Sequence, residues 1–392
     1  MTASQGHNNE VPGVYARLGV KPIINAQSWI TALGGSLMAP EVMRAMQEAS
    51  TAFVDLHELQ GAAGKVLAQA CGAEAGLVTG GAAASNVLMA AACMTGDDPS
   101  KIDRLPDSTG MKNELVLFDG HRNHYDSNYE IAGATIVPWG FAGSGKAYQL
   151  EEAINEKTCA MAWITAPFMH HPMSFAEAAK IAHSHGVPVI VDAAAEVPPA
   201  ENLTRFIAEG ADMVGYSGGK GIGGPQGTGL LVGRADLVDA AYQNHLNTRG
   251  TRAGVGRSAK ASKEDIVGLV TALQIFNDTD HEAVWAGWRA GAVHIVDRLG
   301  GIEGLRVVLE DGDPNRQGPQ AVIYFGSDWR GPGPDELRAA LRAGDPAIHV
   351  GMGGYGDEIN IVMTNVRSGE ERIIADRLEE ILSNQKIEKE TK

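Results

Sequence analysis

The chain has 392 residues, of which 44% are hydrophobic and 20% are charged, and this composition excludes a mainly disordered protein. Its 48 acidic residues outnumber its 32 Lys and Arg residues and give a formal net charge of −16. Because so acidic a chain lacks the broad basic surface that a nucleic-acid backbone requires, we expect no nucleic-acid partner.

The cysteines and the N-terminus indicate a cytoplasmic protein. The three cysteines, at positions 71, 93 and 159, form neither a closely spaced pair nor a disulfide framework. Residues 1–11 are polar and lack the apolar stretch of a signal peptide. The apolar run at 82–94 is too short to cross a bilayer, so we also expect no membrane partner.

Predicted strands and helices alternate over the first two thirds of the chain. The apolar spacing predicts helices at residues 14–18, 41–52, 60–70, 82–94, 150–155, 174–185 and 203–209. Short apolar runs predict strands at residues 76–78, 114–118, 135–138, 160–165, 187–191, 212–217 and 229–232. This alternation predicts an α/β fold with a mainly parallel sheet, helices on both faces, and ligands at the carboxyl ends of the strands.

The pattern changes at residues 244–262, which are rich in Arg, Gly, Lys and Ser. Two long helices are predicted next, followed by strand, strand, helix, strand and helix, at residues 263–276, 281–298, 306–309, 321–325, 334–343, 358–362 and 369–383. We therefore expect an N-terminal segment at 1–40, a large domain at 41–262, and linking helices with a small α+β domain at 263–392.

Three local patterns resemble binding motifs without the context that those motifs need. Residues 140–146 nearly match a phosphate-binding P-loop, but Ala147 stands where that loop needs a hydroxyl for Mg²⁺. Residues 219–224 satisfy GxGxxG but lead into a strand, not into a helix. The histidines form no metal-binding frame, so we expect no metal site. A nucleotide hydrolase centred on Lys146 is kept as an alternative.

Three other features fall at strand ends and fit one cofactor. Residues 79–84, Thr-Gly-Gly-Ala-Ala-Ala, join a strand to a helix N-terminus, where backbone N–H groups bind anions. Asp192 ends a buried strand, and Lys220 follows another strand in a glycine-rich loop. Pyridoxal phosphate needs these three elements: donors for its phosphate, an anion for its ring nitrogen and a lysine for its aldehyde.

Several segments resemble the selenocysteine-synthase-like branch of fold-type I pyridoxal-phosphate enzymes, and especially the D-glucosaminate-6-phosphate ammonia-lyase group. The resemblance covers residues 15–269 and extends faintly to the C-terminus. It is carried by residues 22–25 (with Asn25), 34–38, 54–56, 191–199, 217–220 and 223–226. It implies the fold-type I architecture and this cofactor.

The resemblance also implies roles for single residues. Lys220 would bind the cofactor aldehyde and move the Cα proton of the substrate, Asp192 would pair with the ring nitrogen, and His121 would stack on the ring. The phosphate ligands implied are the backbone N–H groups of Gly81, Ala82 and Ala83 and the hydroxyl of Ser217.

Four further residues are substrate candidates. Arg257 and Lys260 lie in the basic segment where the resembling family places substrate or phosphate contacts, in some cases across a dimer interface; a solvated charge run is the alternative. Arg122 is a candidate for a substrate anion. His124 stands where members of that family commonly carry Pro.

The implied reaction is α,β-elimination, in which a β-hydroxy amino acid or amino-sugar acid gives a 2-keto acid and ammonia. Transamination, racemisation, retro-aldol cleavage, a selenocysteine-synthase-type transfer and cofactor binding without catalysis are the alternatives, since the same residues could serve them. Because fold-type I relatives commonly share sites between subunits, we expect a homo-oligomer, a dimer or a multiple of dimers.

Overall fold

The computed structural model describes residues 13–167, 169–311, 318–354 and 356–383. Their contacts divide into two units. The large unit takes its described residues from 34–281, and the small unit takes its described residues from 13–33, 282–311 and 318–383. The expected domains met at residues 40 and 262, whereas the structure groups residues 13–33 with the C-terminal part of the chain.

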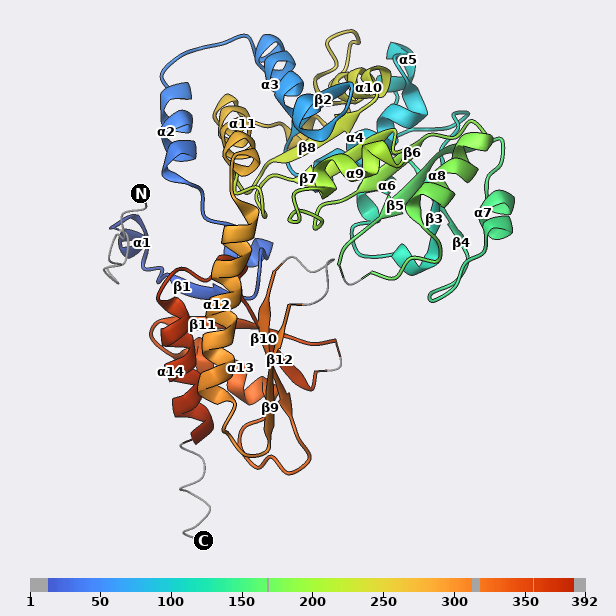
Figure 1. Cartoon of the computed structure of the whole chain (residues 1–392). Helices are drawn as coiled ribbons and strands as arrows, with labels where there is room; N and C mark the ends of the chain where they lie inside the picture. Colours follow the sequence, from blue (N-terminus) through green and yellow to red (C-terminus); the bar gives the residue numbers. More distant parts are fainter. Residues whose placement is uncertain (1–12, 168, 312–317, 355, 384–392) are drawn as a thin grey trace. The chain divides into compact units, whose positions relative to one another are not determined.

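The large unit is built on a seven-stranded sheet in the order β2-β8-β7-β6-β5-β3-β4 (Figure 1). Its strands are β2 (Ala75–Thr79), β3 (Glu114–Phe118), β4 (Thr135–Trp139), β5 (Thr158–Ile164), β6 (Val189–Asp192), β7 (Met213–Ser217) and β8 (Gly229–Gly233). The five strands from β4 to β7 are parallel, and β8 runs antiparallel to both of its neighbours. The mainly parallel sheet expected from the sequence is therefore confirmed.

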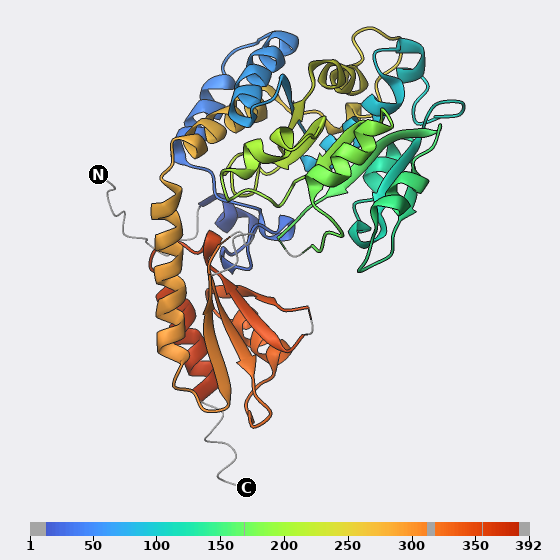
Figure 2. The same cartoon turned by 45° about the vertical axis from the view of Figure 1, so that its right-hand side comes forward.

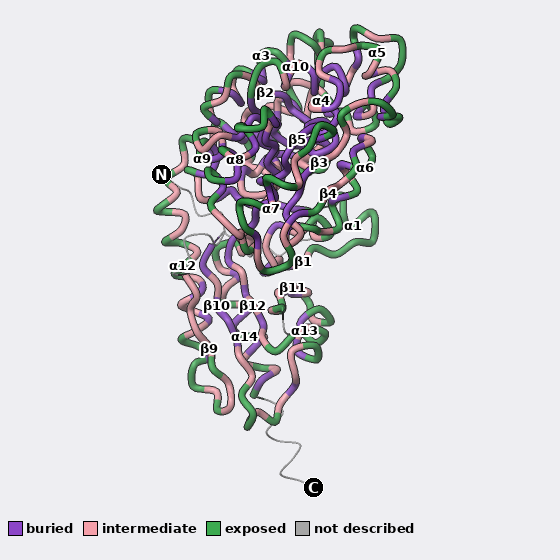
Figure 3. Tube along the Cα trace, turned by 90° about the vertical axis from the view of Figure 1, so that its right-hand side faces the viewer, coloured by how far each residue is buried: buried purple, intermediate pink, exposed green. Residues whose placement is uncertain are grey.

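Helices cover both faces of this sheet because alternate residues of its strands point to opposite sides. Met161 and Trp163 of β5 belong to a core with α3, α8, α9 and α11, whereas Ala160 and Ala162 belong to a core with α4, α6 and α10. The helices are α2 (Pro40–Ala49), α3 (Leu56–Cys71), α4 (Ala82–Thr95), α5 (Pro99–Ile102), α6 (Ser127–Ile131), α7 (Ala147–Ala153), α8 (Phe175–Ser184), α9 (Asn202–Ala208), α10 (Ala235–Leu246) and α11 (Lys263–Asn277), with the 3-10 turns η2 (Asp119–His121) and η3 (Arg257–Ala259). Figure 3 shows the buried residues concentrated along the strands.

The small unit is a five-stranded sheet in the order β1-β11-β12-β10-β9, with helices packed on it. β1 pairs parallel with β11, and the other pairs are antiparallel. The long helices α12 and α14 lie side by side (Figures 1 and 2). The elements are α1 (Gly13–Leu18), β1 (Ile23–Ala26), η1 (Thr31–Leu33), α12 (His281–Leu299), β9 (Leu305–Glu310), β10 (Gln320–Phe325), α13 (Pro334–Ala343), β11 (Ala347–Met352), β12 (Glu358–Val362), η4 (Met363–Asn365) and α14 (Glu370–Ser383).

The structure differs from the sequence prediction mainly in short or unpatterned elements. β1, β11, α5, α6 and α10 were not predicted. α3 begins at Leu56, four residues before the predicted start, because the side chain of Asp55 accepts hydrogen bonds from His57 N and Glu58 N and caps the helix. Within the described ranges, no helix is both long and apolar enough to span a membrane.

Candidate functional site

The turn between β2 and α4, here called the cradle, has the geometry of a candidate anion-binding turn. Gly81 is the N-cap of α4 with φ +111°, and no side chain caps the helix, so the first N–H groups of α4 are left for a ligand. The turn is held by the Thr79 hydroxyl, which lies 3.0 Å from Gly81 O and 2.8 Å from Ser85 Oγ. A Cβ at Gly229 would lie 2.8 Å from Ala82 N, so β8 closely backs the cradle.

Sheet register brings Ser217 close to the same cradle. Thr79 pairs with Gly229, and Gly229 pairs with Ser217, so these three residues form one row across β2, β8 and β7. Ser217 is half-buried at the end of β7. The sequence-predicted phosphate ligands are therefore neighbours in space, although Ser217 lies far along the chain from Gly81.

Asp192 is a buried carboxylate that has hydrogen-bond donors but forms no ion pair with a described residue. Its exposed fraction is 7%; Asn86 Nδ2 donates to Oδ2 at 2.6 Å, and Ala194 N donates to Oδ1 at 3.1 Å. Burial raises the pKa of Asp192, and the hydrogen bonds and the charge of Lys220 oppose this rise. No ion pair to Asp192 occurs within the described part of the chain, so the carboxylate is open to a cationic ring nitrogen.

Asn86 is a candidate site residue that was not predicted from the sequence. It lies one turn into α4, the helix that also forms the cradle, and is buried. Its Oδ1 atom is buried and has no hydrogen-bond partner among the described residues. A buried asparagine in an alanine-rich helix was the only sequence signal that could have pointed to it.

Lys220 lies in a loop in which the two preceding positions have room only for glycine. A Cβ at Gly218 would lie 2.3 Å from Thr228 Oγ1, and one at Gly219 would lie 2.3 Å from Gln226 Cα. The Ser36 hydroxyl also donates to Gly219 O at 3.1 Å. Because these contacts fix the backbone of the loop, they also fix the position from which the half-buried Lys220 side chain extends.

Burial also prepares the Lys220 amine for covalent chemistry. Burial lowers the pKa of Lys220, and the nearby charge of Asp192 raises it. A lysine whose pKa is lowered holds more of the unprotonated amine at neutral pH, and that form attacks an aldehyde. The cradle, the unpaired buried carboxylate and this amine fit the three parts of pyridoxal phosphate.

His121 is enclosed by protein. Its exposed fraction is 0%, and its ring meets the rings of Phe118 and Trp163 edge-on, with centroid distances of 5.0 Å and 4.9 Å. Its Nε2 lies 2.9 Å from Nδ1 of His171. A ring that stacks on a cofactor needs one uncovered face, and His121 has none in this conformation.

Arg122 and His124 are exposed residues of the loop that follows His121. The Arg122 guanidinium pairs with Asp126, a buried carboxylate that also accepts a hydrogen bond from Asn123 N at 3.2 Å. His124 contacts the ring of Tyr125 with a centroid distance of 4.2 Å. The structure therefore does not bring either residue into the buried group around Asp192.

Arg257 and Lys260 are exposed, and their segment abuts the cradle. A Cβ at Gly80 would lie 2.2 Å from Ala259 O, so the backbone of η3 packs directly on the turn before α4. Neither side chain forms an ion pair with any described residue. Both cations are therefore free to meet an anionic ligand.

Within the described residues, no group of three or more His, Cys, Asp or Glu side chains could hold a metal ion.

Comparisons with known proteins agree on one family. The Aminotransferase class-V family matches residues 127–330. The chain is 32% identical to the D-glucosaminate-6-phosphate ammonia lyase of Salmonella typhimurium over 94% of its own length and 98% of that protein. It is 33% identical to the 5'-C-glycyluridine monooxygenase-decarboxylase of a Streptomyces species, over 86% of its length and 83% of that protein.

The chain is also similar to a protein of the selenocysteine-synthase-like branch and to a solved structure. An L-seryl-tRNA(Sec) selenium transferase of Solidesulfovibrio magneticus is 25% identical over 83% of this chain and 75% of that protein. The structure of a D-glucosaminate-6-phosphate ammonia-lyase superposes with a TM-score of 0.83 at 32% identity, covering 96% of this chain and 99% of that one.

Proposed function

We propose that this chain, which belongs to the aminotransferase class-V family of pyridoxal-phosphate-dependent enzymes, is an ammonia-lyase. In the proposed reaction, a β-hydroxy amino acid or an amino-sugar acid loses water and then ammonia, with one water taken up, to give a 2-keto acid. The near full-length similarity to an ammonia lyase supports this reaction.

The observation that carries the proposal is the buried Asp192 carboxylate, which lacks a cation partner among the described residues and lies close enough to Lys220 for each to shift the other's pKa. When bound, pyridoxal phosphate supplies an electron sink that stabilises negative charge at the Cα atom of an amino acid. Asp192 keeps a proton on the ring nitrogen, and Asn86 holds Asp192 in place through Nδ2.

The other residues bind and transfer protons. The N–H groups at the start of α4, from Gly81 to Ala83, bind the cofactor phosphate, with the Ser217 hydroxyl as a further donor. Lys220, with its lowered pKa, takes the Cα proton as a base. Arg257 and Lys260, which form no ion pairs with described residues, are proposed to bind an anionic group of the substrate.

Product analysis tests the reaction. Purified enzyme with pyridoxal phosphate is incubated with D- and L-β-hydroxy amino acids and amino-sugar acids, and ammonia and 2-keto acid are measured without added keto-acid acceptor. Equal yields of both products support the lyase. Products that appear only with a keto-acid acceptor identify an aminotransferase, inversion of Cα identifies a racemase, and release of an aldehyde identifies a retro-aldolase.

A second candidate follows from the Streptomyces relative, whose identity to this chain is comparable and whose name describes oxygen use and loss of carbon dioxide. The same incubations therefore include an oxygen electrode and a carbon dioxide trap. Oxygen uptake with carbon dioxide release, and no ammonia-lyase products, would replace the lyase by that chemistry. A shift of tRNA in a gel at low salt would instead favour a selenium-transferase-type reaction.

We also propose a cytoplasmic homo-oligomer, a dimer or a multiple of dimers, without a nucleic-acid or membrane partner. Between residues 37 and 54 of the large unit, four large apolar side chains are exposed, which is typical of a surface covered by another subunit: Leu37, Met43, Phe53 and Val54. The three free cysteines agree with a reducing compartment. Light scattering that gives only the monomer mass would contradict the oligomer.

A further inference from the structure

Two histidines that follow different strands of the large sheet are hydrogen-bonded to each other. His121 follows β3 and His171 lies in the loop after β5, and His121 Nε2 is 2.9 Å from His171 Nδ1. The His171 ring stacks on Trp163 with a centroid distance of 4.9 Å and an interplanar angle of 19°. Since an aromatic face and a hydrogen bond both restrain His171, its ring has a defined plane.

The members of the pair differ in accessibility. His121 has an exposed fraction of 0%, and its Nδ1 is buried without a hydrogen-bond partner among the described residues. His171 is only partly buried. A ligand that enters this part of the site therefore meets the imidazole of His171 before that of His121.

The loop that carries His171 is also closer to Asp192 along the sheet. The sheet order is β6-β5-β3, and Ile164 of β5 pairs with Asp192 of β6. Thr165 N donates to Asp192 O at 3.0 Å, and Thr165 Oγ1 lies 3.4 Å from His171 Nε2. Thr165 thus connects the His171 imidazole with the strand that ends in Asp192.

Burial favours the neutral form of both imidazoles. Burial, followed by the charge of His171, lowers the pKa of His121 to about 3, and burial, followed by the charges of His170 and Arg205, lowers the pKa of His171. A neutral imidazole can lie against a cationic ring without charge repulsion, which a protonated imidazole cannot.

We infer that His171 is the imidazole that contacts the cofactor ring, and that His121, to which the family resemblance gives that contact, is the positioning residue that orients His171 from behind. The inference rests on the proposed function, because that function supplies the cofactor. It assigns the ring contact to the partly exposed histidine, whose loop follows the strand next to β6.

The first experiment measures cofactor binding, not turnover. The dissociation constant of pyridoxal phosphate is determined by absorbance titration for His171→Ala, His121→Ala, His121→Gln, the double alanine variant and the control His185→Asn, which alters an exposed histidine at the end of α8. Circular dichroism and thermal unfolding check that each variant is folded.

His171→Ala is expected to raise the dissociation constant about tenfold, which corresponds to about 1.4 kcal/mol. His121→Gln is expected to stay within about threefold of wild type, because the glutamine amide can still bond to Nδ1 of His171. The double variant is expected to bind no more weakly than His171→Ala alone, since His121 acts only through His171. His185→Asn is expected to match wild type.

The opposite pattern overturns the inference: wild-type binding by His171→Ala, with His121→Gln as weak as His121→Ala.

A second measurement avoids core substitutions. In wild-type enzyme labelled with [¹³Cε1]-histidine, the His171 signal, assigned from His171→Asn, is expected to shift more than the His121 signal when pyridoxal phosphate is added, and a shift of His121 alone overturns the assignment.

The two proposals fail separately. Absence of ammonia release from an enzyme whose cofactor binding depends on His171 refutes the lyase reaction and supports the His171 contact. Normal ammonia release together with binding that is insensitive to His171→Ala refutes the His171 contact and leaves the lyase reaction supported.

Discussion

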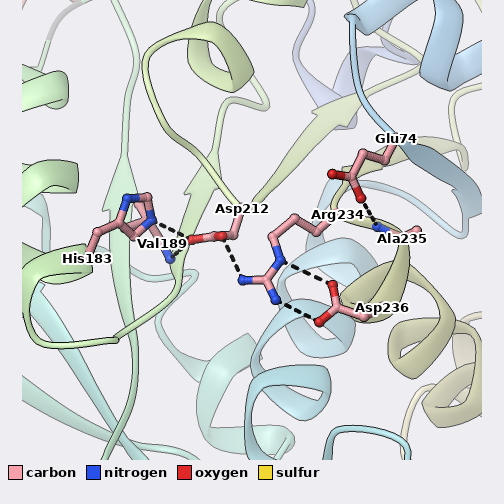
Figure 4. Close-up of polar contacts among 7 residues, drawn as sticks. All are labelled: Glu74, His183, Val189, Asp212, Arg234, Ala235 and Asp236. Atoms are coloured by element: carbon pink, nitrogen blue, oxygen red, sulfur yellow. Dashed lines mark hydrogen bonds and ion pairs between the residues drawn. The ribbon is translucent and has the colours of Figure 1, made fainter.

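Two buried aspartates at opposite ends of the same sheet have opposite surroundings. Asp212 precedes β7 at its amino end, and its side chain is 8% exposed. It accepts hydrogen bonds from His183 Nε2 at 2.8 Å, Val189 N at 2.7 Å and Arg234 Nη1 at 3.0 Å (Figure 4). Arg234 is in turn held by Asp236, and this pairing raises the pKa of Arg234.

Asp192 ends β6 at its carboxyl end, and among the described residues its side chain accepts hydrogen bonds only from the neutral donors of Asn86 and Ala194. The nearby charge of Lys220 and these hydrogen bonds offset only part of the cost of its burial, so its pKa stays raised. A buried charge that is fully paired serves the fold, whereas one left unpaired in a site is a candidate for chemistry. The contrast separates the structural end of this sheet from its functional end.

The largest effect on turnover is expected for a substitution of Lys220, at the functional end of the sheet. Lys220→Ala removes the amine that binds the aldehyde and takes the Cα proton, so we expect turnover to fall by about 10³-fold or more. Borohydride reduction should fix pyridoxal phosphate on the Lys220 peptide of wild type and not of the variant, as measured by peptide mass spectrometry. Lys180→Ala, on the exposed side of α8, is the control. An adduct elsewhere, or retained turnover, would refute the assignment.

Asp192→Asn should change chemistry without loss of stability. The variant keeps the shape of the side chain but loses the charge that holds a proton on the ring nitrogen, so we expect kcat to fall by about 10²-fold. Thermal unfolding of the cofactor-free protein should occur at an equal or higher temperature than in wild type, because an uncompensated buried charge is removed. A wild-type kcat would contradict the role given to Asp192.

Asp212→Ala should lower stability without changing kcat. It leaves the buried N–H group of Val189 without an acceptor, which costs about 1–3 kcal/mol, whereas the half-exposed His183 and Arg234 can turn to water. Urea unfolding measures this loss, and kcat per folded enzyme should be unchanged. The control Asp236→Ala removes an exposed partner of Arg234 and should change stability by less than about 0.5 kcal/mol. Equal losses in the two variants would show that the hydrogen bond to Val189 is not the source.

The smallest effect is a pH dependence of stability. Because the pKa of Asp192 is raised in the folded state above its ordinary value of 3.8, the folded protein binds this proton more tightly than the unfolded chain does. Stability from this group is therefore lost as pH rises from about 4 through the folded pKa, with a slope of at most about 1.4 kcal/mol per pH unit.

Asp192→Asn should remove that slope. Cofactor-free wild type and variant are compared by urea unfolding at a series of pH values, and the advantage of the variant should grow across this window and then level off. Bound pyridoxal phosphate should shrink the difference, since a cationic ring nitrogen then pairs with Asp192. A difference that does not change with pH would contradict the raised pKa.

The sequence predicted most of the large unit because its signals are local. Strand 114–118 was predicted with the bounds that β3 has, and the alanine-rich helix at 82–94 differs from α4 by one residue. Continuous apolar runs marked the buried strands, and glycine clusters marked the loop around Lys220. The four residues of β1 carry too little pattern to identify a strand, and they form one only by pairing with β11, more than 300 residues away.

By itself, the sequence determined the α/β class, the order of most strands and helices, and the positions of Asp192 and Lys220 at strand ends, because apolar period and glycine content are properties of neighbouring residues. Only the tertiary structure decided that Asn86 bonds to Asp192, that η3 packs against Gly80, and that His171 rather than His121 is accessible. These relations join residues that lie far apart along the chain. They depend on sheet order and packing, which a local pattern does not encode.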